Sequence, residues 1–331
     1  MPRWAILPLG LLVASLGAAD APSPLPKDTL PANLPCDKVP LGLDTRLFPK
    51  DNPLTEARVG LGRKLFFDPI LSGDNTVACA TCHQPSHGFA SAEGKPRGIR
   101  GQQLSRRAPT LFNRAYGSAF FWDGRAGSLE DQALRPIEDP MEMGSSVAAA
   151  LARLQARPDY QKQFDAAFND GVTGPNLAKA LASFERVLLR GDSQIDRFRR
   201  LGAHDALSPR VRHGLWLYES KARCWRCHTG ANFTDESFHN TGVSWGKEPL
   251  DLGRYTNTKM DADQGKFKTP TLRGVALTAP YMHDGSLKTL EDVVKFYNQG
   301  STPNPTLDAV LGPLGLSDEE VRSLVEFLKS L

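Results

Sequence analysis

Two copies of the pattern Cys-x-x-Cys-His constrain this chain more than any other feature. One copy spans residues 79–83 and the other spans residues 224–228. In an exported protein this pattern is typical of covalent haem attachment, in which both thiols form thioethers to the porphyrin and the adjacent His binds the iron. A zinc site would need four Cys or His ligands, and a redox-active Cys pair does not require the trailing His. Two complete copies therefore predict two haem c groups. The predicted attachment residues are Cys79, Cys82, Cys224 and Cys227, with His83 and His228 as iron ligands.

The first nineteen residues have the pattern of a cleaved secretory signal peptide. Arg3 is followed by an apolar stretch over residues 4–16 and by small residues at 17–19. An uncleaved membrane anchor is the alternative, and the short apolar stretch argues against it. We therefore expect a periplasmic protein without membrane insertion.

Length and charge exclude some other classes of protein. A chain of 331 residues suggests roughly two domains. The 40 Lys and Arg residues nearly balance the 37 Asp and Glu residues, and no basic block is present, so no nucleic-acid partner is expected. Five Cys residues are too few for a disulfide scaffold, and the sequence does not assign a role to Cys36.

Apolar periodicity predicts a mainly α fold with long loops and little strand. Helices are expected over the ranges 57–67, 145–168 (divided near Pro158), 176–189 and 209–222, and from Thr289 and from Ser317. Long loops are expected over 72–109 and 229–267, and a connector over 192–208.

An internal repeat relates the two halves of the chain. A shift of 161 residues aligns 109–136 with 270–297 at nine identities in 28 positions, where chance would give about two. The repeat predicts two related cytochrome c-like haem domains. We expect an irregular arm over 20–53, an N-terminal haem domain over 54–200 and a C-terminal haem domain over 201–331.

The same alignment distinguishes the open faces of the two haems. Ser128 and Thr289 each cap a short helix, and two turns later Pro136 aligns with Tyr297. If this helix covers the haem, Tyr297 can place a phenolate on the second iron, whereas Pro136 has no atom that binds metal. The alternative is that Tyr297 is an ordinary helix tyrosine.

Several ordered motifs carry a resemblance to a known family. They are residues 107–111, 121–126, Gln132, 136–137, 140–143, 270–273 and 278–285. In these motifs the chain resembles the bacterial dihaem cytochrome c peroxidases over nearly all of its mature length. The resemblance implies that the N-terminal haem reacts with hydrogen peroxide and that the C-terminal haem transfers electrons.

The resemblance also implies roles for individual residues. His83 would be the proximal ligand of the peroxidatic haem, Glu142 would be the acid/base for O–O cleavage, and Gln132 would line the distal pocket. Trp122 would lie between the haems as an oxidisable stepping-stone. On composition alone, Glu142 has the alternative of a surface carboxylate and Trp122 that of a core residue.

Two departures from the usual pattern indicate a branch of the family. Typical members have a distal His, but the chain contains no His between His87 and His204. Typical members also place a Met where Tyr297 stands. Both changes resemble the MauG type, the methylamine-utilisation branch, which uses peroxide to modify a partner protein. This likeness concerns the ligand set and leaves the substrate open.

The family's calcium site is altered as well. Arg107 stands where the family has an Asn ligand, and positions matching Thr278 and Pro280 supply backbone oxygens. Because a guanidinium repels a cation and has no acceptor atom that could bind it, a bound calcium ion is doubtful. We expect Arg107 to replace the ion by donating hydrogen bonds to those carbonyls.

These observations lead to three functional hypotheses. The first is an exported dihaem oxidoreductase that reduces hydrogen peroxide with electrons from a small redox protein or a protein substrate. The second is a non-catalytic dihaem electron-transfer cytochrome, which would need neither an open haem nor Glu142. The third is a haem-based gas sensor, which ranks last because the chain has no output domain.

Overall fold

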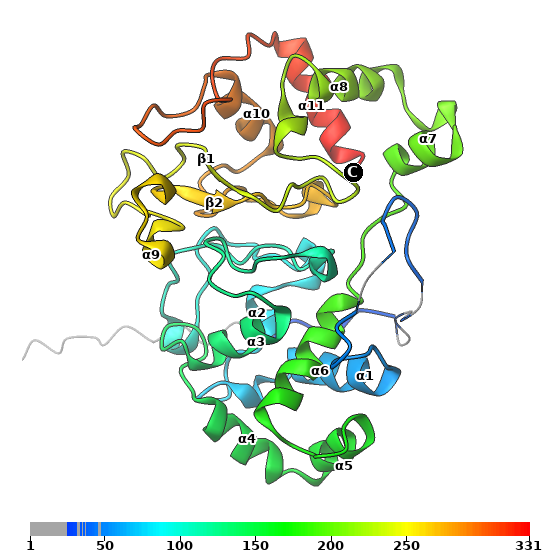
Figure 1. Cartoon of the computed structure of the whole chain (residues 1–331), viewed down its shortest axis with the longest axis vertical. Coiled ribbons are helices and arrows are strands. Elements are labelled where there is room, and N and C mark those ends of the chain that lie inside the picture. Colours follow the sequence, from blue (N-terminus) through cyan, green and yellow to red (C-terminus); the bar gives the residue numbers. More distant parts are fainter. Residues whose placement is uncertain (1–24, 32–33, 35, 37, 46–47) are drawn as a thin grey trace, which may run out of the picture.

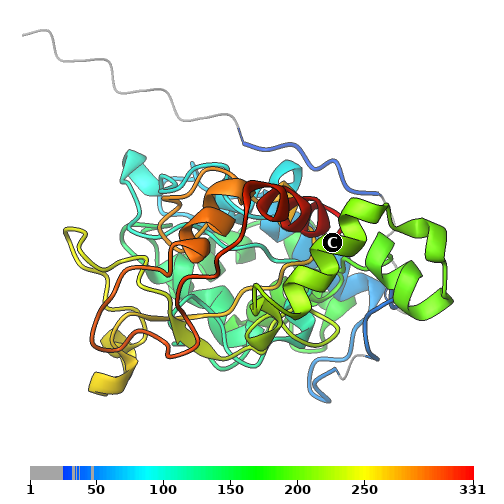
Figure 2. The same ribbon diagram turned by 90° about the horizontal axis from the view of Figure 1, so that it is seen from above.

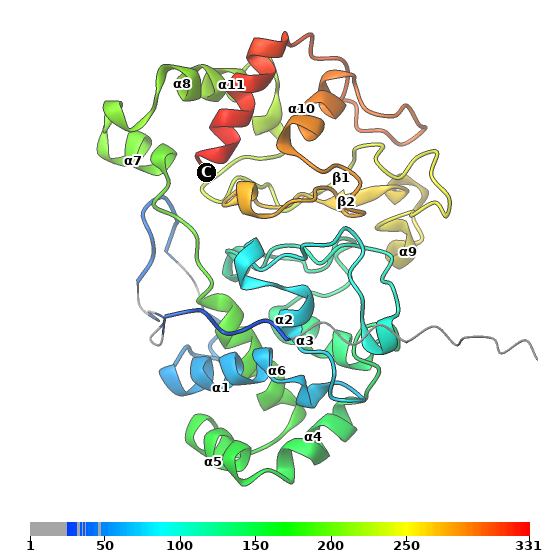
Figure 3. The same ribbon diagram turned by 180° about the vertical axis from the view of Figure 1, so that it is seen from behind.

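The computed structural model describes residues 25–31, 34, 36, 38–45 and 48–331. The predicted signal peptide lies outside these residues. Figure 1 shows two halves stacked along the long axis, with the first half of the chain below and the second above. The described residues of the arm over 20–53 contain no helix or strand. Figure 3 shows the arm reaching α7 (Gln194–Leu201), where the Asp192 amide donates to the Leu41 carbonyl at 2.8 Å.

The mainly α prediction is confirmed. The helices of the first half are α1 (Glu56–Phe67), α2 (Cys79–Cys82), α3 (Leu129–Glu138), α4 (Val147–Gln155), α5 (Pro158–Ala167) and α6 (Gly174–Arg186). The second half adds α7, α8 (Pro209–Glu219), α9 (Tyr255–Thr258), α10 (Leu290–Asn298) and α11 (Asp318–Lys329). Within the described residues, the only sheet pairs β1 (Phe238–Asn240) with β2 (Lys266–Lys268), antiparallel.

Two segments show how local sequence sets the helix ends. Pro158 divides the range 145–168 as predicted, because it occupies the first turn of α5, where no amide donor is needed. The predicted connector over 192–208 is wrong in part, since it contains α7. Ser193 and Asp196 form a capping box that starts this short helix, and Ile195 packs into the core of the second half. The domain boundaries stay predictions.

A close helix crossing supports each half. α1 packs against α6, and α8 packs against α11, as Figure 2 shows for the second pair. A Cβ atom at Gly62 would lie 1.9 Å from the Ala180 carbonyl oxygen, and one at Gly214 would lie 2.0 Å from the Ser323 carbonyl oxygen. Because only glycine allows this approach, both crossings are held at contact distance. α1 and α8 each precede a Cys-x-x-Cys-His segment, so the crossings position the two motifs.

The internal repeat is visible in the structure. The 161-residue shift relates α3 to α10, the helix caps Ser128 to Thr289, and the isolated bridge Phe120–Ala126 to the bridge Tyr281–Leu287. Each of the two halves therefore presents the same short helix to its cavity. Among the described residues, no helix is both long enough and apolar enough to span a bilayer.

Candidate haem centres

The first Cys-x-x-Cys-His segment lines a cavity in the first half. Cys79, Cys82 and His83 all border it. His83 Nδ1 lies 3.0 Å from the Phe89 carbonyl oxygen, a contact that fits an Nδ1–H donor and leaves Nε2 free for iron. Desolvation lowers the pKa of His83, which favours the neutral imidazole that a metal requires.

The second segment has the same geometry in the second half. Cys224, Cys227 and His228 border a second cavity. His228 Nδ1 lies 3.1 Å from the Phe233 carbonyl oxygen, and desolvation lowers the pKa of His228 to about 4. The same second-sphere hydrogen bond in both halves is the arrangement expected for two proximal haem ligands.

Both cavities fit a haem. The space between protein atoms is about 1400 Å³ in the first cavity and about 1490 Å³ in the second, including space open to solvent. All four motif cysteines are free of disulfides, so every thiol is available for a thioether. The donor set is thus complete for two covalently bound haem groups.

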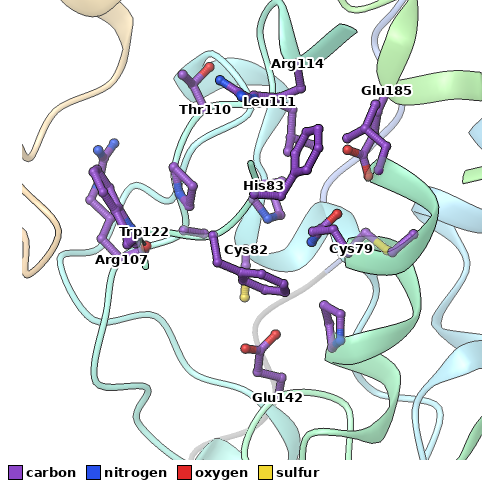
Figure 4. A pocket seen from close by; sticks show the side chains of 18 of the residues that line it. Cys79, Cys82, His83, Arg107, Thr110, Leu111, Arg114, Trp122, Glu142 and Glu185 are labelled. Carbon is purple, nitrogen blue, oxygen red and sulfur yellow. Dashed lines mark hydrogen bonds between the residues drawn. The ribbon is translucent and has the colours of Figure 1, made fainter. Parts of the chain in front are cut away.

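Three predicted residues lie together in the first cavity. Gln132 and Pro136 come from α3, and Glu142 comes from the turn that follows it. Figure 4 shows the Glu142 carboxyl near Cys82. Desolvation and nearby Asp139 raise the pKa of Glu142 to about 7. The Gln132 Oε1 atom is buried without a hydrogen-bond partner, so it can accept a bond from a small molecule.

The two cavities differ on the side formed by the repeated helix. Among the described residues, His83 is the only histidine that lines the first cavity, and Pro136 occupies the repeat position. In the second cavity α10 places Tyr297 among the lining residues together with His228. Desolvation raises the pKa of Tyr297. Tyr297 is therefore brought to the second haem site, and its binding to iron stays a prediction.

Trp122 lies between the two cavities and lines both of them. Its Nε1 donates to the Arg107 carbonyl oxygen at 2.8 Å. Arg107 in turn donates from Nη2 to the Thr278 carbonyl, as expected from the altered calcium site. Its other acceptor is the Ser91 carbonyl at 3.4 Å, in place of the expected Pro280. Arg107 therefore connects the two halves of the molecule.

Sequence reasoning missed other charged groups at the cavities. Glu185 on α6 lines the first cavity, and desolvation raises its pKa to about 8. Lys268 at the end of β2 lines both cavities. Glu185 precedes an Arg on an amphipathic helix, and Lys268 lies in a charged strand. Neither local sequence indicates that the side chain lines a haem cavity. Their positions depend on contacts between distant segments.

His239 is a further group at the second cavity. Its ring nitrogens lie 2.9 Å from Asp235 Oδ2 and 2.5 Å from Asp308 Oδ2. Cys227 and these two carboxylates hold the pKa of His239 high, at about 10. Cys227, Asp235 and His239 also lie close enough together to bind a metal ion, but the Cys227 sulfur belongs to the haem-attachment motif.

Comparisons with known proteins agree with this geometry. The family model of the di-haem cytochrome c peroxidases matches residues 56–204. The methylamine utilization protein MauG of Methylorubrum extorquens is 41% identical over 285 residues, covering 86% of this chain and 80% of the relative. The cytochrome c551 peroxidase of Pseudomonas aeruginosa is 34% identical over 292 residues, covering 85% of this chain and 80% of the relative.

Solved structures share the fold. The crystal structure of a MauG-like protein associated with microbial copper homeostasis superimposes with a TM-score of 0.80 at 32% identity. It covers 88% of this chain and 94% of that chain. The diheme peroxidase BthA from Burkholderia thailandensis has the same fold, with a TM-score of 0.75 at 24% identity over 87% of this chain and 89% of that chain. With two complete haem-attachment sites and relatives along most of its length, this chain belongs to the di-haem cytochrome c peroxidase and MauG family, and it is a di-haem peroxidase-type oxidoreductase that binds two covalent haem c groups.

Proposed function

We propose that this protein is an exported enzyme of the MauG type, which reacts with hydrogen peroxide at the first haem and draws electrons through the second. The observation that carries the proposal is the difference between the two cavities. The first holds Gln132, Pro136 and Glu142 and no second histidine among the described residues, whereas the second holds Tyr297. An open haem beside a carboxyl is suited to peroxide.

The first cavity provides groups for binding peroxide and moving its proton. The bound haem supplies the iron that accepts oxidising equivalents from peroxide. Glu142 takes a proton from one peroxide oxygen and returns it to the other, which then leaves as water. A carboxyl with a pKa near 7 serves both steps at neutral pH. The free Gln132 Oε1 accepts a hydrogen bond and orients the small molecule beside Glu142.

In the proposed reaction, a partner protein in the periplasm supplies the electrons. The partner is either a small redox protein, which gives a peroxidase, or a protein side chain that is oxidised, which gives a maturation enzyme. The relatives include one named as a cytochrome c551 peroxidase and one named as a methylamine utilization protein. A non-catalytic electron-transfer cytochrome is disfavoured because the family consists of oxidoreductases.

Peroxide added to the fully ferric protein tests the proposal. Tyr297 would lower the potential of the second haem, because an anionic phenolate favours ferric iron. With no distal histidine to release, the first haem should be high-spin in the EPR spectrum and react with one equivalent of peroxide without prior reduction. Tyr297→Phe should change the spectrum of the second haem and leave the first haem high-spin. A resting protein with two low-spin haems, inert until it receives one electron, would contradict the proposal.

A second prediction concerns Trp122. Because its indole lies between the cavities, it divides one long electron-transfer step into two. Trp122→Phe should leave the reaction of the first haem with peroxide unchanged and slow oxidation of the electron donor, as measured by stopped-flow absorbance. Trp216→Phe is the matched control, since Trp216 is 56% exposed on α8. Equal donor oxidation in both variants would mean that Trp122 only packs.

A further inference from the structure

Two buried cations form a wall shared by the haem cavities. Arg107 and Lys268 line both cavities, and they are 5% and 8% exposed, respectively. The Lys268 backbone amide donates to the Trp122 carbonyl at 2.8 Å, which fixes β2 against the segment that carries Trp122. Figure 4 shows Arg107 beside Trp122, across the first cavity from Glu185. The wall therefore stands where the halves meet.

The first cavity has more cationic than anionic side chains. The cations that line it are Arg106, Arg107, Arg114, Arg125 and Lys268. Three carboxylates form ion pairs with them. Asp123 pairs with Arg106 and Arg125, and Asp251 also pairs with Arg106. Glu236 pairs with Arg114 and Lys268. Among the described residues, Arg107 donates only to carbonyl oxygens. The five basic side chains of the lining are thus matched by only three carboxylate partners.

The remaining acids of the cavity do not offset this excess. Glu185 has a pKa of about 8 and its Oε2 lacks a hydrogen-bond partner, so it is mostly neutral at pH 7. Glu142 has a pKa of about 7 and is assigned to peroxide. Uncompensated positive charge at buried positions is unfavourable, because burial removes the hydration that stabilises it.

Both shared cations retain hydrogen-bond donors without acceptors. Lys268 Nζ donates to Glu236 Oε2 at 3.1 Å and to the Thr269 carbonyl at 3.2 Å, whereas an ammonium has three donors. Desolvation and Arg114 lower the pKa of Lys268 to about 7, so Glu236 alone does not compensate its charge. Arg107 Nε is buried and has no partner. These donors need an anionic acceptor from within the cavities.

We propose that Arg107 and Lys268 bind haem propionates, so that one cationic wall holds carboxylates at the junction of the two haem sites. Haem is the group that the cavities accept, and its propionates are carboxylates that can accept hydrogen bonds from Arg107 Nε and from the third Lys268 Nζ donor. Charge-assisted hydrogen bonds of this kind are stronger than neutral ones. The inference rests on haem binding alone and is independent of the proposed reaction with peroxide.

Reduction potentials and vibrational spectra of the resting holoprotein test this proposal. Removing a nearby positive charge favours ferric over ferrous haem, and Coulomb's law for a unit charge about 10 Å away gives roughly a tenfold change in the equilibrium. That change corresponds to about 59 mV for a one-electron couple. Lys268→Gln and Arg107→Gln should each lower the potential of at least one haem and shift its propionate bending band in resonance Raman spectra. Lys268→Arg should retain both properties.

The control variant is Lys329→Gln, which removes the same charge from a pair on the exposed surface of α11. Potentials and propionate bands that match this control in both glutamine variants would overturn the proposal. A changed potential with unchanged bands would also overturn it, because the cation would then act only through space. If the glutamine variants lose haem, Glu236→Gln provides a second test. It frees Lys268 for the propionate and should raise the potential and shift the band.

Discussion

Replacing Cys79 and Cys82 with Ala should yield a protein with one covalent haem and no reaction with peroxide. The two thiols border the first cavity and are free to form both thioether bonds of that haem. Replacing Cys224 and Cys227 should also remove one haem but spare the first reaction with peroxide, because the first cavity is intact. Intact-protein mass spectrometry counts the haems, and stopped-flow absorbance follows the reaction.

Loss of a haem should also destabilise its half of the molecule. An empty cavity of this size removes far more contact than one large-to-small core substitution, which costs about 2–5 kcal/mol. Cys36→Ala is the matched control, since Cys36 lies outside both motifs and is itself only partly buried, against a core cluster that includes Val59 and Phe66 of α1. It should keep both haems and the thermal unfolding midpoint of the parent. A double variant that still carries two covalent haems would refute the attachment sites.

The features that could be predicted from sequence are those encoded locally or by repetition. The Cys-x-x-Cys-His segments predict the attachment residues by spacing alone. The 161-residue repeat places Tyr297 and Pro136 at equivalent positions, and the structure places both in their cavities. Capping residues such as Ser128 and Thr289 predict short helices because their side chains accept hydrogen bonds from backbone amides in the first turn.

The features that escaped prediction depend on tertiary contacts. The helix α7 is only eight residues long and highly charged, so it resembles a solvated connector, although its Ser193–Asp196 capping box was present in the sequence. Lys268 faces two cavities only because β2 is held against the Trp122 carbonyl. Glu185 is buried because α6 borders the first cavity, which lies inside the folded half. No local pattern encodes which charges meet between two halves of a chain.

Glu142→Gln should slow the reaction with peroxide by about 10²- to 10⁴-fold, the range that general acid–base groups contribute. The amide keeps the size of the side chain but cannot take up and return a proton. In the parent, the rate should rise with pH through about 7, because the deprotonated carboxylate accepts the first proton and desolvation raises the pKa of Glu142 to about 7. Stopped-flow measurements across this pH range would show both effects.

The slower reaction expected of Glu142→Gln would not result from unfolding of the variant. A carboxyl whose folded pKa lies above its unfolded value destabilises the folded state progressively as pH rises above the unfolded value. Replacement by a neutral amide should therefore leave the free energy of unfolding at pH 8 unchanged or higher. The Glu142 backbone bond from Ile99, at 2.7 Å, does not depend on the side chain. Glu138→Gln, at an exposed position on α3, is the matched control and should react at the parental rate. If Glu142→Gln also reacts at that rate with the parental pH profile, Glu142 is not the acid/base, and the proton must move through another group in the cavity.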